Sequence, residues 1–275
     1  GAALFMLVMG YFVARSQKGK LITVYRGLKL LVWGLLLNIG MNFHLLVKIF
    51  SGSMPIDPWP FVFGADILFL AGFSLIIMAF FRSLFQRNIT AWIMLGLFFT
   101  LAGHFIPSYS GDAEWLVYLQ AFIKGNTHWS YFPVFPWVAY PVAGYVFQIL
   151  DEKYRFYEFS RKGLIYIASA LFVLVLITFQ WGFSISIDFY KYHHHSLLYS
   201  IWVITLVCFW IILIRLLVQN REQKPVVIYL QWVGRYITNF YVVQWLLIGN
   251  IGTALYKTQS APAVMIWFVV IVAFT

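Results

Sequence analysis

Residues 197–218 read LLYSIWVITLVCFWIILIRLLV, a run in which Arg215 is the only charged residue. A helix of this length rises about 33 Å, enough to cross the roughly 30 Å hydrocarbon core of a bilayer. The whole chain has the same character, because 62% of its 275 residues are hydrophobic and only 10% are charged. So few charges cannot cover a soluble protein of this size. The composition predicts a membrane protein and excludes disordered, fibrous, disulfide-rich and nucleic-acid-binding classes.

The apolar runs are continuous and not alternating, which favours helices over a membrane barrel. We therefore predict an all-α, polytopic transmembrane helix bundle with about nine membrane segments. The expected segments are residues 2–15, 27–49, 64–84, 89–106, 134–150, 163–182, 197–218, 236–255 and 262–275. No hydrophilic block is long enough to fold separately, so 1–275 is expected to be a single transmembrane domain. Its first and last segments are short for a span, and we expect truncation at both ends.

Basic residues alternate between the connections of these segments. Of the 19 lysines and arginines, 15 fall in one set of alternate connections, and Lys48, Lys124, Lys191 and Lys257 fall in the other. The positive-inside rule places the larger set in the cytoplasm. All six histidines lie toward the opposite face, together with the longest connection, from about residue 107 to 133.

Catalytic motifs of soluble enzymes are absent, including the phosphate-binding loop, the Rossmann fingerprint, HExxH and GxSxG. Candidates must then come from polar residues at membrane depth, which are costly in lipid. Asn38 and Asn42 are one helical turn apart and share a face, and Gln244 is a deep polar group in the 236–255 segment. Helix–helix hydrogen bonding is the alternative role for such residues. Asp66 opens the 64–84 segment, where it either orients a catalytic group or stabilises the helix N-terminus.

Histidines at the outer face are candidate general bases, because a neutral imidazole can accept a proton from a hydroxyl or an amine. His104 ends the 89–106 segment, and His128 lies in the long outer connection. Each has an alternative role as an interfacial residue with a local partner. The run His193–His195 resembles a metal-binding tract, but consecutive helical residues point about 100° apart, so we expect a cap of the next helix and no metal.

Several phrases resemble a known family. YRGLKLLVWGLLLN (25–38) and FGADILFLAGFSLIIMAF (63–80) resemble blocks of membrane-bound sugar acyltransferases. YFPVFPWVAYPVAGYVF (131–147) is similar to a phrase of bacterial proteins related to heparan-alpha-glucosaminide N-acetyltransferase, and VGRYITNFYVVQW (233–245) resembles a late helix of the same superfamily. Two departures are Gln244, where the family often has histidine, and Tyr236-Ile237, which replace Ser-Leu. The family's usual catalytic histidine is expected upstream of Gly1.

The resemblance implies acyl transfer, with acetyl the expected group, from cytosolic acetyl-CoA to a sugar or glycan on the outer side of the membrane. It also implies a multi-pass protein of the bacterial inner membrane. The site predictions are His128, His104 and Asp66 as catalytic residues; Asn38, Asn42, Trp137, Tyr140 and Gln244 as substrate-binding residues; and Arg26, Lys29 and Arg235 as acyl-CoA-binding residues. Trp137 and Tyr140 are either a wall for the sugar ring or part of an interfacial aromatic belt.

Two other classes of function compete with the enzyme. One is a transporter or flippase for a polar or lipid-linked glycan, which matching helix breaks in two halves of the chain would favour. The other is a non-catalytic membrane scaffold or partner subunit. Membrane lipid is a partner in all three cases, nucleic acid in none, and the sequence does not indicate an oligomeric state.

Overall fold

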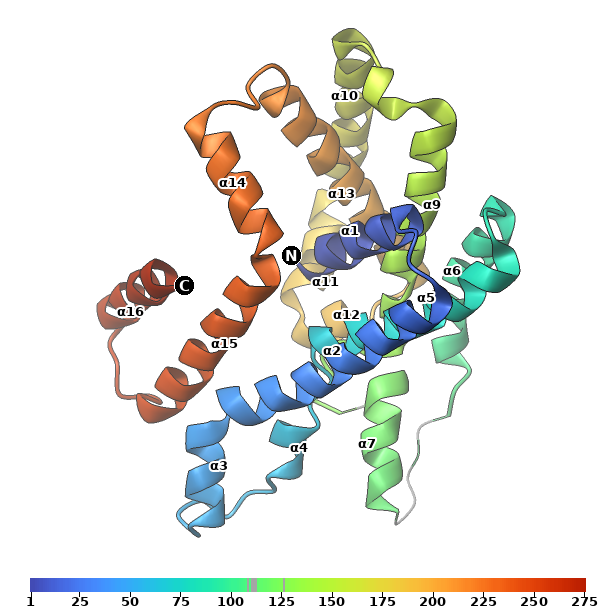
Figure 1. The fold of residues 1–275 in the computed structure, drawn as a ribbon. Coiled ribbons are helices and arrows are strands. Elements are labelled where there is room, and N and C mark those ends of the chain that lie inside the picture. The colour runs from blue at the N-terminus through green and yellow to red at the C-terminus, as the bar shows by residue number, and fades with distance from the viewer. Residues whose placement is uncertain (108, 110–112, 126) are drawn as a thin grey trace. The chain divides into compact units, whose positions relative to one another are not determined.

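The computed structural model describes residues 1–107, 109, 113–125 and 127–275, and the regular structure within them is entirely helical (Figure 1). This confirms the all-α part of the predicted fold class. The helices are α1 (Ala2–Arg15), α2 (Lys20–Met41), α3 (Phe43–Phe50), α4 (Trp59–Val62), α5 (Ile67–Phe85), α6 (Ile89–Leu101), η1 (Ala102–His104), α7 (Glu114–Ile123), α8 (Val134–Trp137), α9 (Ala139–Tyr154), η2 (Phe156–Glu158), α10 (Arg161–Ile177), α11 (Phe179–Ile187), α12 (Phe189–His193), α13 (Leu197–Val218), α14 (Pro225–Arg235), α15 (Ile237–Ala254) and α16 (Ala261–Phe274).

The prediction of about nine membrane spans is wrong. Among the described residues, three helices are long and apolar enough to cross a membrane: α2, α5 and α13. A fourth span is possible if α10 and α11, which meet at a 65° bend, are counted together. The remaining apolar runs do form helices, but α1, α6 and α16 have only 14, 13 and 14 residues. Helices of that length rise about 20 Å, which is short of a bilayer core.

Two expected boundaries also change. The predicted 27–49 segment begins earlier, at Lys20, and breaks after Met41 into α2 and α3. Arg26 and Lys29, expected at the edge of a connection, therefore lie inside α2, one turn apart and both exposed. The long outer connection contains a helix, α7, although residues 108, 110–112 and 126 of that connection lie outside the described part.

The described chain divides into two compact units, residues 1–31 with 65–219 and residues 32–64 with 220–275. The expectation of a single domain over 1–275 stays a prediction. In the first unit, α1 lies against α9 (Figure 1). The two backbones touch at two glycines. A Cβ on Gly10 would lie 1.9 Å from the Pro141 carbonyl oxygen, and one on Gly144 would lie 1.9 Å from the Leu7 carbonyl oxygen.

The second unit is organised around the break between α2 and α3. A helix break leaves backbone groups without intrahelical partners. The side chain of Asn250 in α15 bonds to two of these backbone groups. Its Nδ2 donates to the Gly40 oxygen at 2.8 Å, and its Oδ1 accepts from the His44 nitrogen at 3.0 Å. The amide of one side chain thus holds α15 against the α2–α3 corner.

Candidate functional site

Helix α9 of the first unit starts beside a buried cluster of aromatic and histidine side chains. Trp137, just before α9, has 0% exposure, and its indole Nε1 donates to the His193 carbonyl oxygen at 2.8 Å. Its ring also packs against those of Phe132 and His195. Full burial does not fit an interfacial belt, and Trp137 does not line the two histidine cavities described below. Its position suits a residue that holds the histidine segment in place.

His195 is held in one tautomer by two hydrogen bonds. Its Nδ1 lies 2.7 Å from the Tyr192 carbonyl oxygen, which can only accept, so Nδ1 carries the proton. Nε2 is then an acceptor, and the Tyr140 hydroxyl donates to it at 2.8 Å. His195 and Tyr140 are both buried. Burial, with smaller contributions from the neighbouring His193 and His194, lowers the pKa of His195 to about 4. His195 is therefore neutral at neutral pH.

Replacing Tyr140 with phenylalanine should destabilise the protein by about 1–3 kcal/mol, because the buried Nε2 of His195 would lose its donor. Thermal melting of the purified protein in detergent measures this effect. Tyr166→Phe is the matched control, since Tyr166 is exposed on α10. Equal melting temperatures for the two variants would contradict the hydrogen bond.

Two cavities meet at His194. The larger cavity has a volume of about 510 Å³. Its polar lining residues are Thr127, His128, Ser130, Ser184, Asp188, His193 and His194. We call it the histidine pocket. The smaller, about 240 Å³, is lined by His104, Lys124, His194 and His195 among others, and we call it the lysine pocket. Tyr190 and His194 line both. The structure thus brings the predicted bases His104 and His128 to neighbouring cavities, with both side chains exposed.

Three polar atoms at these cavities are buried without a hydrogen-bond partner among the described residues: Nδ1 of His193, Nδ1 of His194 and Oγ1 of Thr127. Burial and the neighbouring His193 lower the pKa of His194 to about 4, so its imidazole is neutral and can accept a proton. Gly125 lets the chain pass close by, since its φ is +72° and a Cβ there would lie 2.6 Å from His194 Cε1. These atoms have almost no accessible surface, so a ligand in the cavities would reach them only if side chains moved, whereas the exposed His128 lines the histidine pocket directly.

Asp66 stands at the N-terminus of α5, as expected, and is buried. Its neighbour Ala65 exchanges backbone hydrogen bonds with the 129–132 segment, from the Ala65 nitrogen to the Trp129 oxygen at 3.1 Å and from the Phe132 nitrogen to the Ala65 oxygen at 2.8 Å. Burial first, and then the Asp66 charge, raise the pKa of Tyr131. The Tyr131 ring in turn contacts His193 at 5.7 Å between centroids. Asp66 therefore lies near Tyr131, which contacts the histidine cluster, and a catalytic role for Asp66 stays a prediction.

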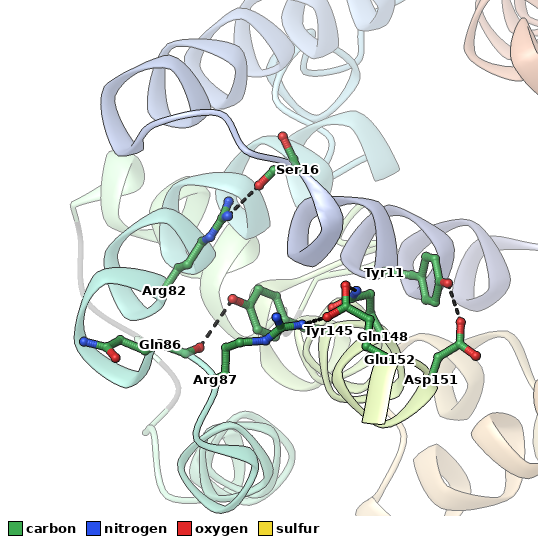
Figure 2. A network of polar contacts seen from close by, with 9 residues as sticks. All are labelled: Tyr11, Ser16, Arg82, Gln86, Arg87, Tyr145, Gln148, Asp151 and Glu152. Carbon is green, nitrogen blue, oxygen red and sulfur yellow. Dashed lines mark hydrogen bonds and ion pairs between the residues drawn. The ribbon is translucent and has the colours of Figure 1, made fainter. Parts of the chain in front are cut away.

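The other end of α9 joins a basic network, shown in Figure 2. Glu152 accepts from Arg87 and from Gln148, and the Arg87 guanidinium lowers the pKa of that carboxyl. Arg82 reaches across to the end of α1, where it donates to the Ser16 carbonyl oxygen at 2.5 Å. Tyr11 closes the network by donating to Asp151 at 2.6 Å. These contacts gather the ends of α1, α5 and α9 into one charged face, which we call the basic face because Arg15, Arg82 and Arg87 there outnumber Asp151 and Glu152.

The predicted substrate-binding asparagines lie in the second unit and bond to backbone. Asn38 Nδ2 donates to the Val62 and Gly64 oxygens at 3.0 and 2.8 Å, and Asn42 Nδ2 donates to the Asn38 and Phe61 oxygens at 3.0 and 3.1 Å. Both side chains therefore hold the 61–64 segment on α2. Gln244 lies partly exposed in α15, and Arg235 is exposed in the last turn of α14. A substrate role for these four residues stays a prediction.

An apolar groove runs along α9 and α13. One cavity of about 290 Å³ lies between the two helices, and one of about 660 Å³ continues toward Tyr11, Asp151 and Arg215. Leu7, Phe147, Cys208 and Ile211 line both, so they form one feature, which we call the α9–α13 groove. Its other end reaches Thr100, which also lines the lysine pocket.

Sequence reasoning missed the central place of His193–His195, which it treated as a helix cap. In the structure α12 ends at His193, and Ser196 precedes α13 as its N-cap, so the three histidines lie where one helix gives way to the next. The signal that could have found them is their density, since three of six histidines fall in one connection. Within the described residues, no group of three or more histidine, cysteine or acidic side chains could hold a metal ion.

Comparison with known proteins gives one match. Residues 1–174 of the 275 match the family model described as heparan-alpha-glucosaminide N-acetyltransferase, catalytic. The matched range contains α1 to α9, and with them the basic network, His104, His128 and Trp137. No curated protein and no solved structure matches the chain.

Proposed function

The chain belongs to the heparan-alpha-glucosaminide N-acetyltransferase catalytic family, and from that premise we propose that it transfers an acetyl group from acyl-CoA to a sugar acceptor. The family and the apolar helices make it an integral membrane acetyltransferase. The donor, the acceptor, the multi-pass topology and a bacterial inner-membrane location belong to the proposal. The observation that carries it is the pair of chemically different ends of α9, one basic and one rich in neutral histidines.

The basic face suits the phosphates of CoA. Arg82 bonds to backbone carbonyls of α1 and the following turn, which leaves its positive charge in place near Arg15. Arg26 and Lys29 add two exposed cations one turn apart on α2. Cations gathered on one face raise the local concentration of a polyanion such as CoA. The positive-inside rule favours the cytoplasmic side for clustered lysines and arginines, and the proposal puts this face there, on the side of the acyl-CoA pool.

The histidine pocket suits the acceptor and the proton transfer. A neutral imidazole takes the proton from the acceptor amine or hydroxyl as its nitrogen or oxygen attacks the thioester carbonyl. The new C–N or C–O bond forms, the C–S bond breaks, and the proton passes on to the departing thiolate of CoA. His128 is the proposed base, since it lines the pocket and is exposed, and His104 is its counterpart in the lysine pocket.

Acetyl transfer from radiolabelled acetyl-CoA to glucosamine by the purified protein tests this function. His128→Ala should lower kcat by about 10²–10⁴, the usual contribution of a general base. Arg26→Gln with Lys29→Gln should instead raise the KM for acetyl-CoA and leave the acceptor KM unchanged. His44→Gln, at a histidine of α3 in the second unit that lines neither pocket, is the control. An unchanged kcat for His128→Ala would remove His128 as the base, and absence of transfer to any amino or neutral sugar would refute the enzyme.

A transporter or flippase for a glycan is the second candidate, and one observation favours it. Helices α10 and α11 form a broken span with a 65° bend at Thr178. Discontinuous helices are a common feature of transporter binding sites. Uptake of labelled glucosamine into proteoliposomes without acetyl-CoA would support transport, whereas acetylated product without such uptake supports the enzyme.

A further inference from the structure

The lining of the α9–α13 groove is two apolar stripes facing each other. On α9 the stripe is Ala139, Val142, Ala143, Val146, Phe147 and Leu150, and on α13 it is Leu197, Ser200, Ile201, Ile204, Cys208 and Ile211. Steps of three and four residues keep each stripe on one helix face. From Ala139 to Leu150 the apolar part of the α9 side extends about 17 Å at the helical rise, and beyond it the groove ends at the polar side chains of Tyr11, Asp151 and Arg215. The groove therefore offers a long and narrow apolar surface.

The polar groups of this lining already have partners. The Thr100 hydroxyl donates toward the Gly96 and Leu97 oxygens, and the Ser200 hydroxyl donates to the Ser196 oxygen at 3.2 Å. The indole of Trp92 donates to the Gln86 oxygen at 3.0 Å. A ligand with amides, such as a pantetheine arm, would leave its polar groups unpaired at a cost of about 1–3 kcal/mol each. A hydrocarbon chain carries no such penalty.

Apolar lining alone does not select a ligand in a membrane, because lipid tails are as apolar as the groove. Selection must come from the polar groups at its end. The groove reaches the lysine pocket at Thr100, where Lys124 supplies a cation. The Lys124 ammonium donates to the Ile106 oxygen, and it belongs to none of the ion pairs formed among the described residues. Because an ammonium has three donors, it retains capacity for an anionic oxygen such as that of a phosphate.

The lysine pocket and the histidine pocket share Tyr190 and His194 in their linings, and the histidine pocket is also lined by the polar side chains of His128, Ser184 and Asp188. Three features follow in order along the first unit: an apolar groove, a cation, and a polar pocket with hydrogen-bonding groups and the Tyr190 ring. That order matches a hydrocarbon chain, a phosphate and a sugar joined in one molecule.

We infer that the acceptor is a lipid-linked sugar phosphate. Its hydrocarbon chain lies in the α9–α13 groove, its phosphate faces Lys124, and its sugar enters the histidine pocket. The inference rests on the proposed acetyl transfer and adds the chemical class of the acceptor. It also accounts for an apolar groove that lies near a pocket with a polar lining.

Binding of three probes to the purified protein in nanodiscs, without acetyl-CoA, tests the inference. The probes are dodecyl-phosphate-linked glucosamine, glucosamine 1-phosphate without a chain, and dodecyl glucosaminide without a phosphate. The first should bind about tenfold or more tighter than each of the others, since each lacks one recognised part. Equal dissociation constants for the three probes would overturn the inference.

Substitutions in the groove and at Lys124 test which part of the ligand each of them recognises. Ala143→Trp fills the groove and should abolish the advantage of the chain, while Ala170→Trp on the exposed face of α10 should not. Ile204→Trp fills the groove from α13 and serves as the second variant if Ala143→Trp does not fold. Lys124→Gln should abolish the advantage of the phosphate, with Lys257→Gln, an exposed lysine, as its control.

The outcomes separate this inference from the proposed function. A chain advantage that persists in both groove variants would show that the chain is bound as surrounding lipid, which overturns the inference. If the probes bind as expected and no acetyl group is transferred to them, the lipid-linked ligand stands and the enzyme fails. Transfer to soluble glucosamine with equal binding of all probes would leave the enzyme standing and end the lipid-linked acceptor.

Discussion

Replacing Gly144 with alanine is expected to destabilise the protein by about 3 kcal/mol or more, the upper part of the range for overpacking a core. An alanine Cβ would lie 1.9 Å from the Leu7 carbonyl oxygen and 3.0 Å from the Tyr11 nitrogen, and both are backbone atoms of α1. Backbone cannot rotate away as a side chain can, so α1 and α9 would have to separate. The Tyr11–Asp151 hydrogen bond at the same interface would be disturbed as well.

Thermal melting in detergent measures this loss, and Gly96→Ala is the matched control. Gly96 is also within a helix of the first unit, but its Cβ would meet Val142 Cγ1 at 3.4 Å, an ordinary contact. Alanine there should be neutral or stabilising by about 0.5–1 kcal/mol, because it restricts the unfolded chain and favours helix. If Gly144→Ala melts at the wild-type temperature, the close approach of α1 to α9 is wrong.

The positions of the helices could be predicted from the sequence, and the number of membrane spans could not. Apolar runs show where helices form, and each of the nine expected segments contains one. They do not show where a helix bends. Thr178 illustrates the reason, since its hydroxyl donates to the Leu174 oxygen at 2.7 Å and accepts from Trp202 Nε1 at 3.0 Å. A side chain that competes for backbone and tertiary partners can break a helix within an apolar run.

The candidate site was predictable only in part, for a similar reason. His104 and Asp66 could be selected as polar groups at the ends of apolar segments, and His128 as a histidine of the long outer connection. His193–His195 could not be interpreted correctly, because their directions depend on where α12 ends and on partners far along the chain. Trp137 bonds to the His193 backbone 56 residues away, and Tyr140 bonds to His195 55 residues away. Helical periodicity carries no information on such contacts.

The pH dependence of stability is the second large effect that we expect. The pKa of His195 is about 4 in the folded protein and about 6.5 for an unperturbed histidine. Between these values the unfolded chain binds a proton that the folded protein does not, so stability falls as pH falls. The full contribution is present above pH 6.5 and is lost by about pH 4, a change of about 3 kcal/mol for a shift of this size. His194 acts in the same direction.

Melting temperatures between pH 7.5 and pH 4.5 measure this effect. The His195→Asn variant shows how much of the pH dependence comes from His195. Asn does not titrate, so its melting temperature should depend less steeply on pH than that of the wild type, even though the variant is less stable at pH 7.5. His44→Gln should keep the wild-type slope, because His44 lies in α3 of the second unit. An equal slope in wild type and His195→Asn would mean that folding does not shift the pKa of His195, and the assignment of a buried neutral imidazole held below its ordinary pKa would fail.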